Sequence, residues 1–468
     1  MNLPHRIRRQ RWQVSAPDPA AAFALRSVLR QENERLLLPA LESAFAAAAV
    51  GDAEIHIPRL TLNVRLSHPE RLAEELPEQL FAAASSALAV LLMPNEAEQK
   101  QVQVHTSADR LRHYLLKGSL PWFDAGRERA VLVDELASAA AAWVADPPAG
   151  WQSCRAMLPE EGEAAFAFAF RMLQLLTADG REKLLDAAAV GTAMPVVSAL
   201  RALAAGRGES SDGALRRLAL ALLLLAGRRL PGPGSAVASD ALLAEAMASL
   251  ARAAGQIAPE ALTQRPKSQV AQASPDAKPA GDELPVTPVV ATTTSPDTEP
   301  GLPVLSAGLI LLHPFLPRLF ETLDLTSADG ALNTADLPRA AALLHWLATG
   351  SDTPHEFELG LIKLLLGLAP DDPLPVAGGC LGEAEQAEGA ALLAAAIEHW
   401  PALRSTSVDG LRVAFLQRRG LLRPAESGWT LHPESESFDL LLGGLPWGIS
   451  IIKLPWMRTP IFTEWPSR

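Results

Sequence analysis

The chain has 468 residues, of which 49% are hydrophobic, and it carries a formal net charge of −12. This length and apolar content are sufficient for two to four domains with substantial cores. The acidic balance argues against nucleic acid as a partner, because phosphate binding requires a basic surface.

No feature of the sequence indicates export or a membrane span. Two cysteines, Cys154 and Cys380, are too few for a disulfide framework and favour a reducing cytosol. The arginine-rich residues 1–12 are followed by no apolar segment and do not form a secretory signal. The most apolar run, residues 218–226, is shorter than the about 20 residues that cross a bilayer. We therefore expect a soluble protein.

The first region, residues 1–130, is predicted to be helical with a little β-structure. Residues 19–50 have apolar side chains at helical spacing and predict one or two amphipathic helices. Residues 54–66 alternate apolar and polar side chains, which predicts a half-buried strand. Pro58 restricts the early part of this strand to an edge of a sheet.

Further helices are predicted at residues 69–93 and 111–117, and Gly118 is expected to end the second of them. The second region, residues 131–262, is rich in alanine and leucine and is predicted to consist mostly of helices. Its expected breaks lie at Pro147-Pro148, 206–213 and 231–234.

Residues 263–303 differ from both neighbouring regions. They are rich in Pro, Ser, Thr and Ala and have few large side chains. Repeated prolines prevent a helix, and the lack of large apolar residues prevents a core. We predict a disordered linker that separates two helical portions.

The last region, residues 304–468, is predicted to be a helical domain that ends in a Trp- and Pro-rich strand segment. Pro314 and Pro317 divide the apolar stretch 307–325, which favours two helices meeting at a turn. The remaining helix candidates are 338–349, 356–368, 383–400 and 407–417. Residues 429–432 and 448–454 are candidates for a small sheet. The chain as a whole is thus expected to be mainly α, with two helical portions and a few short β-strands.

No motif for catalysis, metal binding or a cofactor is found. The histidines are scattered, and four of them lie in apolar helical patterns, where a core or helix-edge role is expected: His113, His313, His345 and His399. The sequence contains no phosphate-binding loop, nucleophile elbow or zinc-binding helix. We expect a non-enzymatic protein without cofactor or metal.

The most unusual feature is a Leu-Pro-Trp triplet that occurs three times, at 120–122, 445–447 and 454–456. Proline fixes the backbone, and tryptophan combines a large apolar face with one hydrogen-bond donor. Two readings remain open, since these rings could bind a partner or could close their own helical domains. The candidate protein-binding residues are Trp122, Trp447, Trp456 and Trp465.

Several blocks, in order along the chain, resemble the tape measure protein family of contractile injection systems, which are bacterial phage-tail-like particles of the extracellular type. The first two blocks are IHIPRLTLNV (55–64) and HYLLKGSLPWF (113–123). The others are GLILLHPFLPRLFETLDL (308–325), RAAALLHWLATG (339–350), LGLIKLLLGL (359–368), HWPALRSTSVDGLRVAFLQRRGLL (399–422) and LLGGLPWGISIIKLPWM (441–457).

This resemblance implies a non-enzymatic assembly protein that sets the length of the inner tube. It implies the inner tube, baseplate or hub, and cap proteins as partners, and a place in the cytoplasm during assembly or in the tube lumen. As one continuous helix the chain would measure roughly 700 Å. The predicted helices are short and repeatedly broken, however, which is typical of compact domains. The alternative is a compact initiation factor or chaperone that brings tube subunits or cargo to the baseplate.

Overall fold

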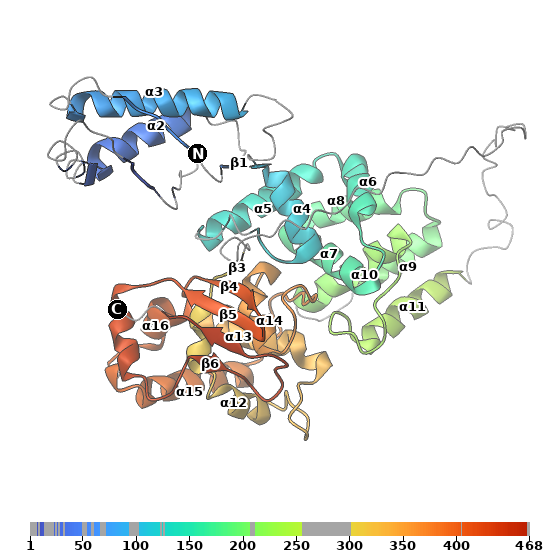
Figure 1. Ribbon diagram of the computed structural model, residues 1–468. Helices are drawn as coiled ribbons and strands as arrows, with labels where there is room; N and C mark the ends of the chain where they lie inside the picture. Colours follow the sequence, from blue (N-terminus) through green and yellow to red (C-terminus); the bar gives the residue numbers. More distant parts are fainter. Residues whose placement is uncertain are drawn as a thin grey trace, which may run out of the picture. The chain divides into compact units, whose positions relative to one another are not determined.

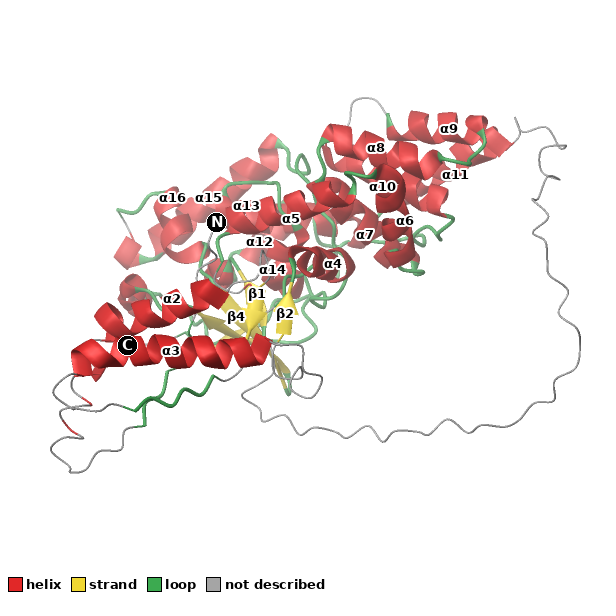
Figure 2. Cartoon of the chain, turned by 90° about the horizontal axis from the view of Figure 1, so that it is seen from above, coloured by secondary structure: helices red, strands yellow, loops and turns green. Residues whose placement is uncertain are grey.

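The computed structural model describes most of the chain, which folds as two compact units, Met1–Asp109 and Arg110–Arg468. The described residues are 7, 10–13, 23, 26, 29–30, 33–48, 54–57, 60–65, 72–92, 103–121, 124, 127–205, 211–254, 301–403 and 405–465. Helices predominate among them, and short strands form two small sheets (Figure 1 and Figure 2). The predicted mainly α fold is confirmed.

The first unit contains two helices that pack side by side, α2 (Leu38–Ala48) and α3 (Leu72–Leu92). A π-helical turn, η1 (Asn33–Leu37), precedes α2. The helices bury aliphatic residues against each other because each has one apolar face. These residues are Leu29, Leu37, Leu41, Ala44, Leu76, Leu80 and Ala84.

The strand predicted over residues 54–66 is wrong in its length. Of the residues in this range that the structure describes, only β1 (Glu54–His56) is a strand, and it pairs antiparallel with β2 (Gln103–His105). Among the described residues, 60–65 have no ladder partner, although Leu62 and Val64 pack against the core of α2 and α3. The alternating pattern therefore reflects packing on helices and not strand pairing.

The second unit begins with eight helices, whose residues 110–254 we call the middle block. They are α4 (Ser107–Lys117), α5 (Arg129–Trp143), α6 (Pro147–Met157), α7 (Gly162–Leu175), α8 (Ala178–Ala189), α9 (Met194–Ala204), α10 (Ser211–Ala226) and α11 (Asp240–Ala254). Leu111, Tyr114 and Leu115 of α4 are buried in the core of this block. The second unit therefore begins before residue 131, where the sequence suggested a boundary.

Local signals determine where these helices start and end. Pro147 occupies the first turn of α6, and the Asp146 carboxylate before it accepts a hydrogen bond from the Ala149 N–H. Thr177 caps α8 in the same way. Gly118 follows α4 with a φ of 68°, a conformation that glycine adopts without strain. The expected helix end at Gly118 is confirmed.

α7 lies at the centre of the middle block. Phe166, Phe168 and Phe170 are buried on it, and α10 packs against it (Figure 1). A helix that is apolar on nearly every side must be surrounded by protein. Its sequence therefore explains its central place.

The rest of the second unit, residues 301–465, is the C-terminal block. Its 3₁₀- and π-helical segments are η5 (Ala307–Leu312), η6 (Thr334–Asp336), η7 (Glu356–Leu359), η8 (Pro401–Leu403), η9 (Arg412–Leu416) and η10 (Ser437–Gly444). Its α-helices are α12 (Leu316–Thr322), α13 (Leu337–Thr349), α14 (Gly360–Leu365), α15 (Glu383–His399) and α16 (Val408–Leu411). The two helical segments expected in 307–325 and the end of α13 before Gly350 are confirmed.

A five-stranded sheet completes this block, in the order β3-β4-β5-β7-β6. The strands are β3 (Leu302–Val304), β4 (Gly420–Ala425), β5 (Gly428–Pro433), β6 (Ile451–Ile452) and β7 (Ile461–Thr463). β5 and β7 are parallel, and the other neighbours are antiparallel. The two expected strand segments lie in this sheet, with β7 between them.

The predicted linker is only partly within the described residues, because 255–300 lie outside them. Its predicted end is wrong by two residues, since Leu302 and Pro303 belong to β3. β3 is at the edge of the sheet, where a proline is tolerated because one side of the strand needs no backbone donor.

Candidate functional site: a polar joint between two blocks

The middle block and the C-terminal block have separate hydrophobic cores. They meet at a surface that we call the joint, formed by side chains of α4, α5, α7 and α10 on one side and by residues 350–380 on the other. Few apolar side chains cross it. Leu305, Phe357 and Ala377 pack in the middle-block core, and Ala236 packs against the C-terminal core. The joint is therefore held largely by polar contacts.

Three charged side chains are buried together at the joint. The Arg171 guanidinium binds the Glu356 carboxylate through two hydrogen bonds, Nε–Oε2 at 2.8 Å and Nη2–Oε1 at 2.9 Å. Lys363 Nζ lies 2.7 Å from Glu356 Oε1, and the Leu374 N–H donates to the same oxygen at 2.9 Å. The side chains of all three ions are at most 2% exposed. One carboxylate of the C-terminal block thus joins α7 to α14.

The end of α4 is shaped to fit this ion cluster. Arg171 Nη1 donates to the Leu115 carbonyl in the last turn of α4 at 2.7 Å. A Cβ at Gly118 would lie 2.6 Å from Arg171 Nη2 and 2.7 Å from Glu356 Oε1. Only glycine provides both the positive φ and the space at this position. α4 therefore ends directly against the joint.

A second carboxylate, Glu358, forms a parallel set of contacts. Arg129 Nε of α5 lies 2.5 Å from Glu358 Oε1, and Arg129 Nη2 donates to the Thr353 carbonyl. His345 Nε2 lies 3.3 Å from the same Glu358 oxygen, and its Nδ1 lies 2.8 Å from the Ser351 carbonyl. His345 is 1% exposed, so the core role expected for this histidine is confirmed.

The third element of the joint is an irregular extended run, residues 374–378, which we call the inserted segment. All five of its residues are buried. Leu374 and Val376 belong to the C-terminal core, whereas Ala377 belongs to the middle-block core. The inserted segment is therefore anchored in the C-terminal block and contacts the middle block.

The middle block contacts the inserted segment through its main chain. Gln174 Nε2 donates to the carbonyls of Pro354 at 2.8 Å and Val376 at 3.1 Å. Arg216 Nη2 donates to the Pro375 carbonyl at 2.9 Å, and the Ala377 N–H donates to Asp212 Oδ1 at 2.9 Å.

At the start of α10, the Asp212 N–H and the Ser211 hydroxyl both donate to the Gly378 carbonyl. Every one of these middle-block groups meets a peptide group of the segment and no side chain. This is how proteins bind an extended peptide without reading its sequence closely.

The electrostatics favour charged carboxylates at the joint. Burial by itself would raise the pKa of Glu356, but the charges of Arg171 and Lys363 and the hydrogen bonds to the carboxylate outweigh burial and lower this pKa to about 2. Glu358 behaves in the same way, since His345 and Arg129 outweigh burial and lower its pKa to about 2. Both residues are therefore anions at neutral pH.

Sequence reasoning missed this site, although a signal was present. Arg171 is the only charged residue between 164 and 176, and Lys363 is the only one between 359 and 370. A lone charge in an apolar helix cannot be paired along that helix, so it requires a distant partner. The signal predicts burial and a partner, but it does not identify Glu356.

The candidate tryptophans Trp447 and Trp456 both lie on the C-terminal core. Trp447 Nε1 donates to the Leu311 carbonyl at 3.0 Å, and its ring meets Phe315 edge to face. Trp456 Nε1 donates to the Leu365 carbonyl at 2.8 Å, and its ring stacks on Phe320. Both rings are half-buried. These contacts favour a role in closing the domain, while a docking role stays a prediction.

The other two candidates are less informative. Trp465 is half-buried beside Arg418, whose guanidinium carbon lies 5.4 Å from the ring centroid. Arg418 itself is buried and paired with Asp439 at 2.7 Å. Trp122 lies outside the described residues. Trp447, Trp456 and Trp465, the three candidates that the structure describes, each contact different neighbours. The structure adds a buried Trp400, whose Nε1 donates to the Leu441 carbonyl.

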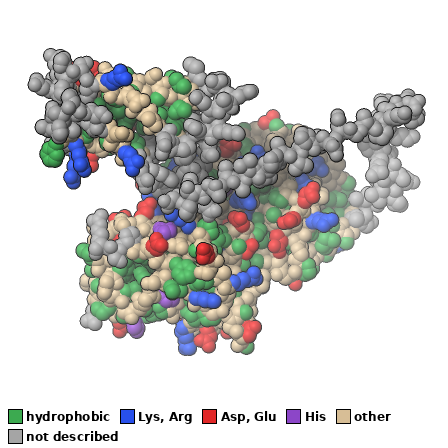
Figure 3. Space-filling view, in the orientation of Figure 1, with side chains coloured by type: hydrophobic (Ala, Val, Ile, Leu, Met, Phe, Trp, Pro, Cys, Tyr) green, Lys and Arg blue, Asp and Glu red, His purple; other side chains and the backbone are tan. Residues whose placement is uncertain are grey.

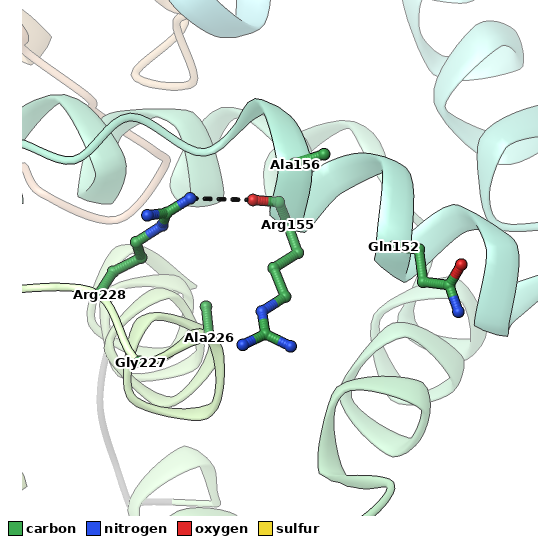
Figure 4. A pocket seen from close by; sticks show the side chains of 6 residues that line it. All are labelled: Gln152, Arg155, Ala156, Ala226, Gly227 and Arg228. Carbon is green, nitrogen blue, oxygen red and sulfur yellow. Dashed lines mark hydrogen bonds between the residues drawn. The ribbon is translucent and has the colours of Figure 1, made fainter. Parts of the chain in front are cut away.

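A shallow hollow of about 490 Å³ lies between α6 and the turn after α10 (Figure 4). Arg155, Arg228 and Gln152 supply its polar side chains, and Arg228 Nη2 donates to the Arg155 carbonyl at 3.1 Å. On the face drawn in Figure 3, acidic, basic and hydrophobic side chains of the second unit are interspersed.

Both cysteine thiols are kept in their neutral form. Burial raises the pKa of the Cys154 thiol to about 12, and burial with the nearby Asp212 raises that of Cys380 to about 12. In the part of the chain that the structure describes, no three His, Cys, Asp or Glu residues are grouped as metal ligands. Within the same part, no helix combines the length and hydropathy that a bilayer crossing requires.

Comparison with known proteins gives one result. A protein-family model described as contractile injection system tape measure protein matches residues 4–465. Neither a curated protein nor a solved structure matches the chain.

Proposed function

The chain belongs to the contractile injection system tape measure protein family, and from this premise we propose that it is a non-enzymatic assembly protein that sets the length of the inner tube. The observation that supports this proposal is the extent of the family match, which covers residues 4–465. The match includes the first unit, both blocks and the segment between them. The proposed role therefore belongs to the whole chain.

The folded blocks must open if the chain is to act as a ruler. The longest described α-helix, α3, has 21 residues and measures about 32 Å at 1.5 Å per residue. The helices of the middle block are shorter and pack against one another. We propose that this compact form precedes tube growth and that the chain is extended in the growing tube.

The partners follow from the proposed role. They are the inner tube, the baseplate or hub and the cap protein of the particle, and nucleic acid is not among them. The net charge of −12 supports that exclusion because phosphate binding requires a basic surface. The proposed location is the cytoplasm during assembly and the tube lumen afterwards.

Deletions and insertions within residues 263–300 test the ruler. Electron microscopy of particles should show tube length changing in proportion to the residues removed or added. The slope identifies the working conformation, because a helix contributes about 1.5 Å per residue and an extended chain about 3.3 Å. The control is a shuffled sequence of unchanged length and composition. Tubes of unchanged length in the deletion series would exclude a metric role for this segment.

A second candidate function is a compact initiation factor or chaperone that carries tube subunits or cargo to the baseplate. Its support is the compact packing of the second unit and its buried joint. In this case, shortening residues 263–300 should reduce the number of particles and leave their length unchanged. Particle counts and lengths from the same micrographs separate the two functions.

We further propose that Trp447, Trp456 and Trp465, together with Trp122, contribute to partner docking. Trp447→Phe keeps a ring against Phe315 but removes the hydrogen bond to Leu311. Trp447→Ala removes both. If docking matters, Trp447→Ala should lower co-purification with baseplate proteins while the thermal melt is kept. A loss of stability in proportion to the loss of binding would favour the domain-closing role.

A further inference from the structure

The joint has the properties of an interface between separate molecules, although one chain forms both sides. Each block keeps most of its own core, because parting the blocks withdraws only Phe357, Ala377 and Leu305 from the middle-block core and Ala236 from the C-terminal core. Apart from Phe357, which packs on Tyr114, the surfaces that part carry Arg171, Glu356, Glu358 and peptide groups, all of which water can solvate. Ion pairs of this kind contribute little net stability, because their attraction is offset by the cost of removing them from water. The joint can therefore open without unfolding either block.

The two faces of the joint are preformed. The inserted segment is fixed on the C-terminal block by the buried side chains of Leu374 and Val376. Gln174 and Arg216 are fixed on α7 and α10, and Arg216 is also held by Asp212 and by the Val237 carbonyl. Rigid faces lose little conformational entropy when they meet, so each can bind a matching face on another molecule.

The covalent connection between the two faces is long. Residues 255–300 can span at most about 150 Å, at about 3.3 Å per residue. Tethering favours closure within one chain, but this advantage falls as the tether lengthens. A second copy of the chain carries the same inserted segment, which can replace the chain's own segment when the local concentration is sufficient. The two surfaces are already complementary in shape and charge, because they are the surfaces that meet within one chain.

We propose that the middle-block face of one copy binds the inserted segment of a second copy, so that the chains exchange C-terminal blocks. The two faces differ, and the contact is therefore head to tail. It closes as a reciprocal dimer or continues as an open chain of copies. This inference goes beyond the proposed function and does not depend on it.

Two variants can make the exchange visible. Gln174→Glu places a carboxylate against the carbonyls of Pro354 and Val376, and Gln174 is only half-buried when the joint is closed. Ala377→Asp places a carboxylate in the middle-block core and leaves the C-terminal core untouched. Each should weaken its own face about 100-fold, because the carboxylate meets carbonyl oxygens in the first variant and apolar side chains in the second and finds no donor in either place. The side chains become exposed when the joint opens, so both variants should fold.

Neither variant can close on itself, but a mixture retains one intact pair of faces. The wild-type inserted segment of the Gln174→Glu chain fits the wild-type middle block of the Ala377→Asp chain. With different affinity tags on the two full-length chains, we expect a 1:1 complex on mixing. The matched control is the double variant, which should pair with neither single variant. Co-purification in the mixture no higher than with the double variant would overturn the proposal.

A second experiment measures the exchange of C-terminal blocks between chains whose joint is wild type. A site-specific protease sequence inserted within residues 255–300 allows the tether to be cut after folding. Two cut samples, one with a fluorescent C-terminal block and one with a tagged middle block, are then mixed in equal amounts. Exchange should bring fluorescence to about half of the tagged middle blocks at equilibrium, because the faces are identical. Fluorescence that stays entirely with its original partner would contradict the proposal, whatever the tube-length experiments show.

Discussion

The joint and the tryptophan-lined end of the C-terminal block both connect segments that are far apart in the sequence, but they use opposite chemistry. At the joint, Arg171 and Glu356 are 185 positions apart and bind through two charged hydrogen bonds. At the chain's end, Trp456 and Leu365 are 91 positions apart, and an apolar ring does most of the contact. Charged contacts exchange readily with water, whereas apolar rings gain nothing from exposure. The first region is suited to opening and the second to staying closed.

The largest expected effect is the loss of the carboxylate at the joint. Glu356→Ala leaves Arg171 and Lys363 buried without an anion and should cost about 3–5 kcal/mol of unfolding free energy. Chemical denaturation followed by circular dichroism measures this loss. The control is Arg171→Met/Glu356→Gln/Lys363→Met, which removes all three charges and should recover most of the stability. If the triple variant is as unstable as Glu356→Ala, the unpaired charges are not the cause.

Trp456→Ala should have the next largest effect, about 3 kcal/mol, because it removes a large ring from Phe320 and leaves the Leu365 carbonyl without its donor. This loss involves no charged group, so it should be the same at low and high salt. Denaturation at two ionic strengths checks this expectation. A salt-dependent loss would show that charged groups contribute to the contacts of Trp456.

Acid should act on the joint and spare the tryptophans. The folded pKa values of Glu356 and Glu358 are lowered to about 2, so both carboxylates stabilise the fold fully above their unfolded values near 4.5. This stability is lost as the pH falls from about 4.5 towards 2, at most about 1.4 kcal/mol per pH unit for each group.

Glu358→Gln should flatten the pH profile of unfolding, and Trp447→Phe should leave its shape unchanged. An equally steep profile in Glu358→Gln would show that other carboxyls are responsible for the acid sensitivity. Urea denaturation at a series of pH values gives these profiles.

The smallest effect on stability is expected from an exposed ion pair. It joins a basic and an acidic side chain, as the buried pairs of the joint do, but it lies in water. Lys183 and Asp179 lie 2.6 Å apart on α8, with side chains 55% and 73% exposed. Lys183→Ala should change stability by about 0.5 kcal/mol or less, because water already solvates both groups. A loss comparable to that of Glu356→Ala would mean that burial is not what makes the joint important.

Local sequence signals account for most of the helices. Pro147, Gly118 and Gly350 mark helix ends by their backbone preferences, and each of these ends is found in the structure. The same signals could not place β7 beside β5, since three residues contain too little alternation to reveal a strand.

The joint could not be predicted from the sequence for a different reason. The apolar surroundings of Arg171 indicate that it is buried, but the identity of its partner depends on how two blocks dock. Docking follows from matching surfaces, and no single segment contains that information. The inserted segment is harder still to predict, because its role depends on peptide groups that every residue shares.

The order of strands in the five-stranded sheet has a consequence for synthesis of the protein. β7 is the last strand in the sequence, yet it lies between β5 and β6, while β3 at the far edge is made about 160 residues earlier. The sheet cannot be completed until residues 461–463 have left the ribosome. The middle block, whose neighbours in the fold are mostly close in sequence, can fold well before that. During translation, the folded middle block should therefore expose its side of the joint to solvent until the C-terminal block has been synthesised and has folded.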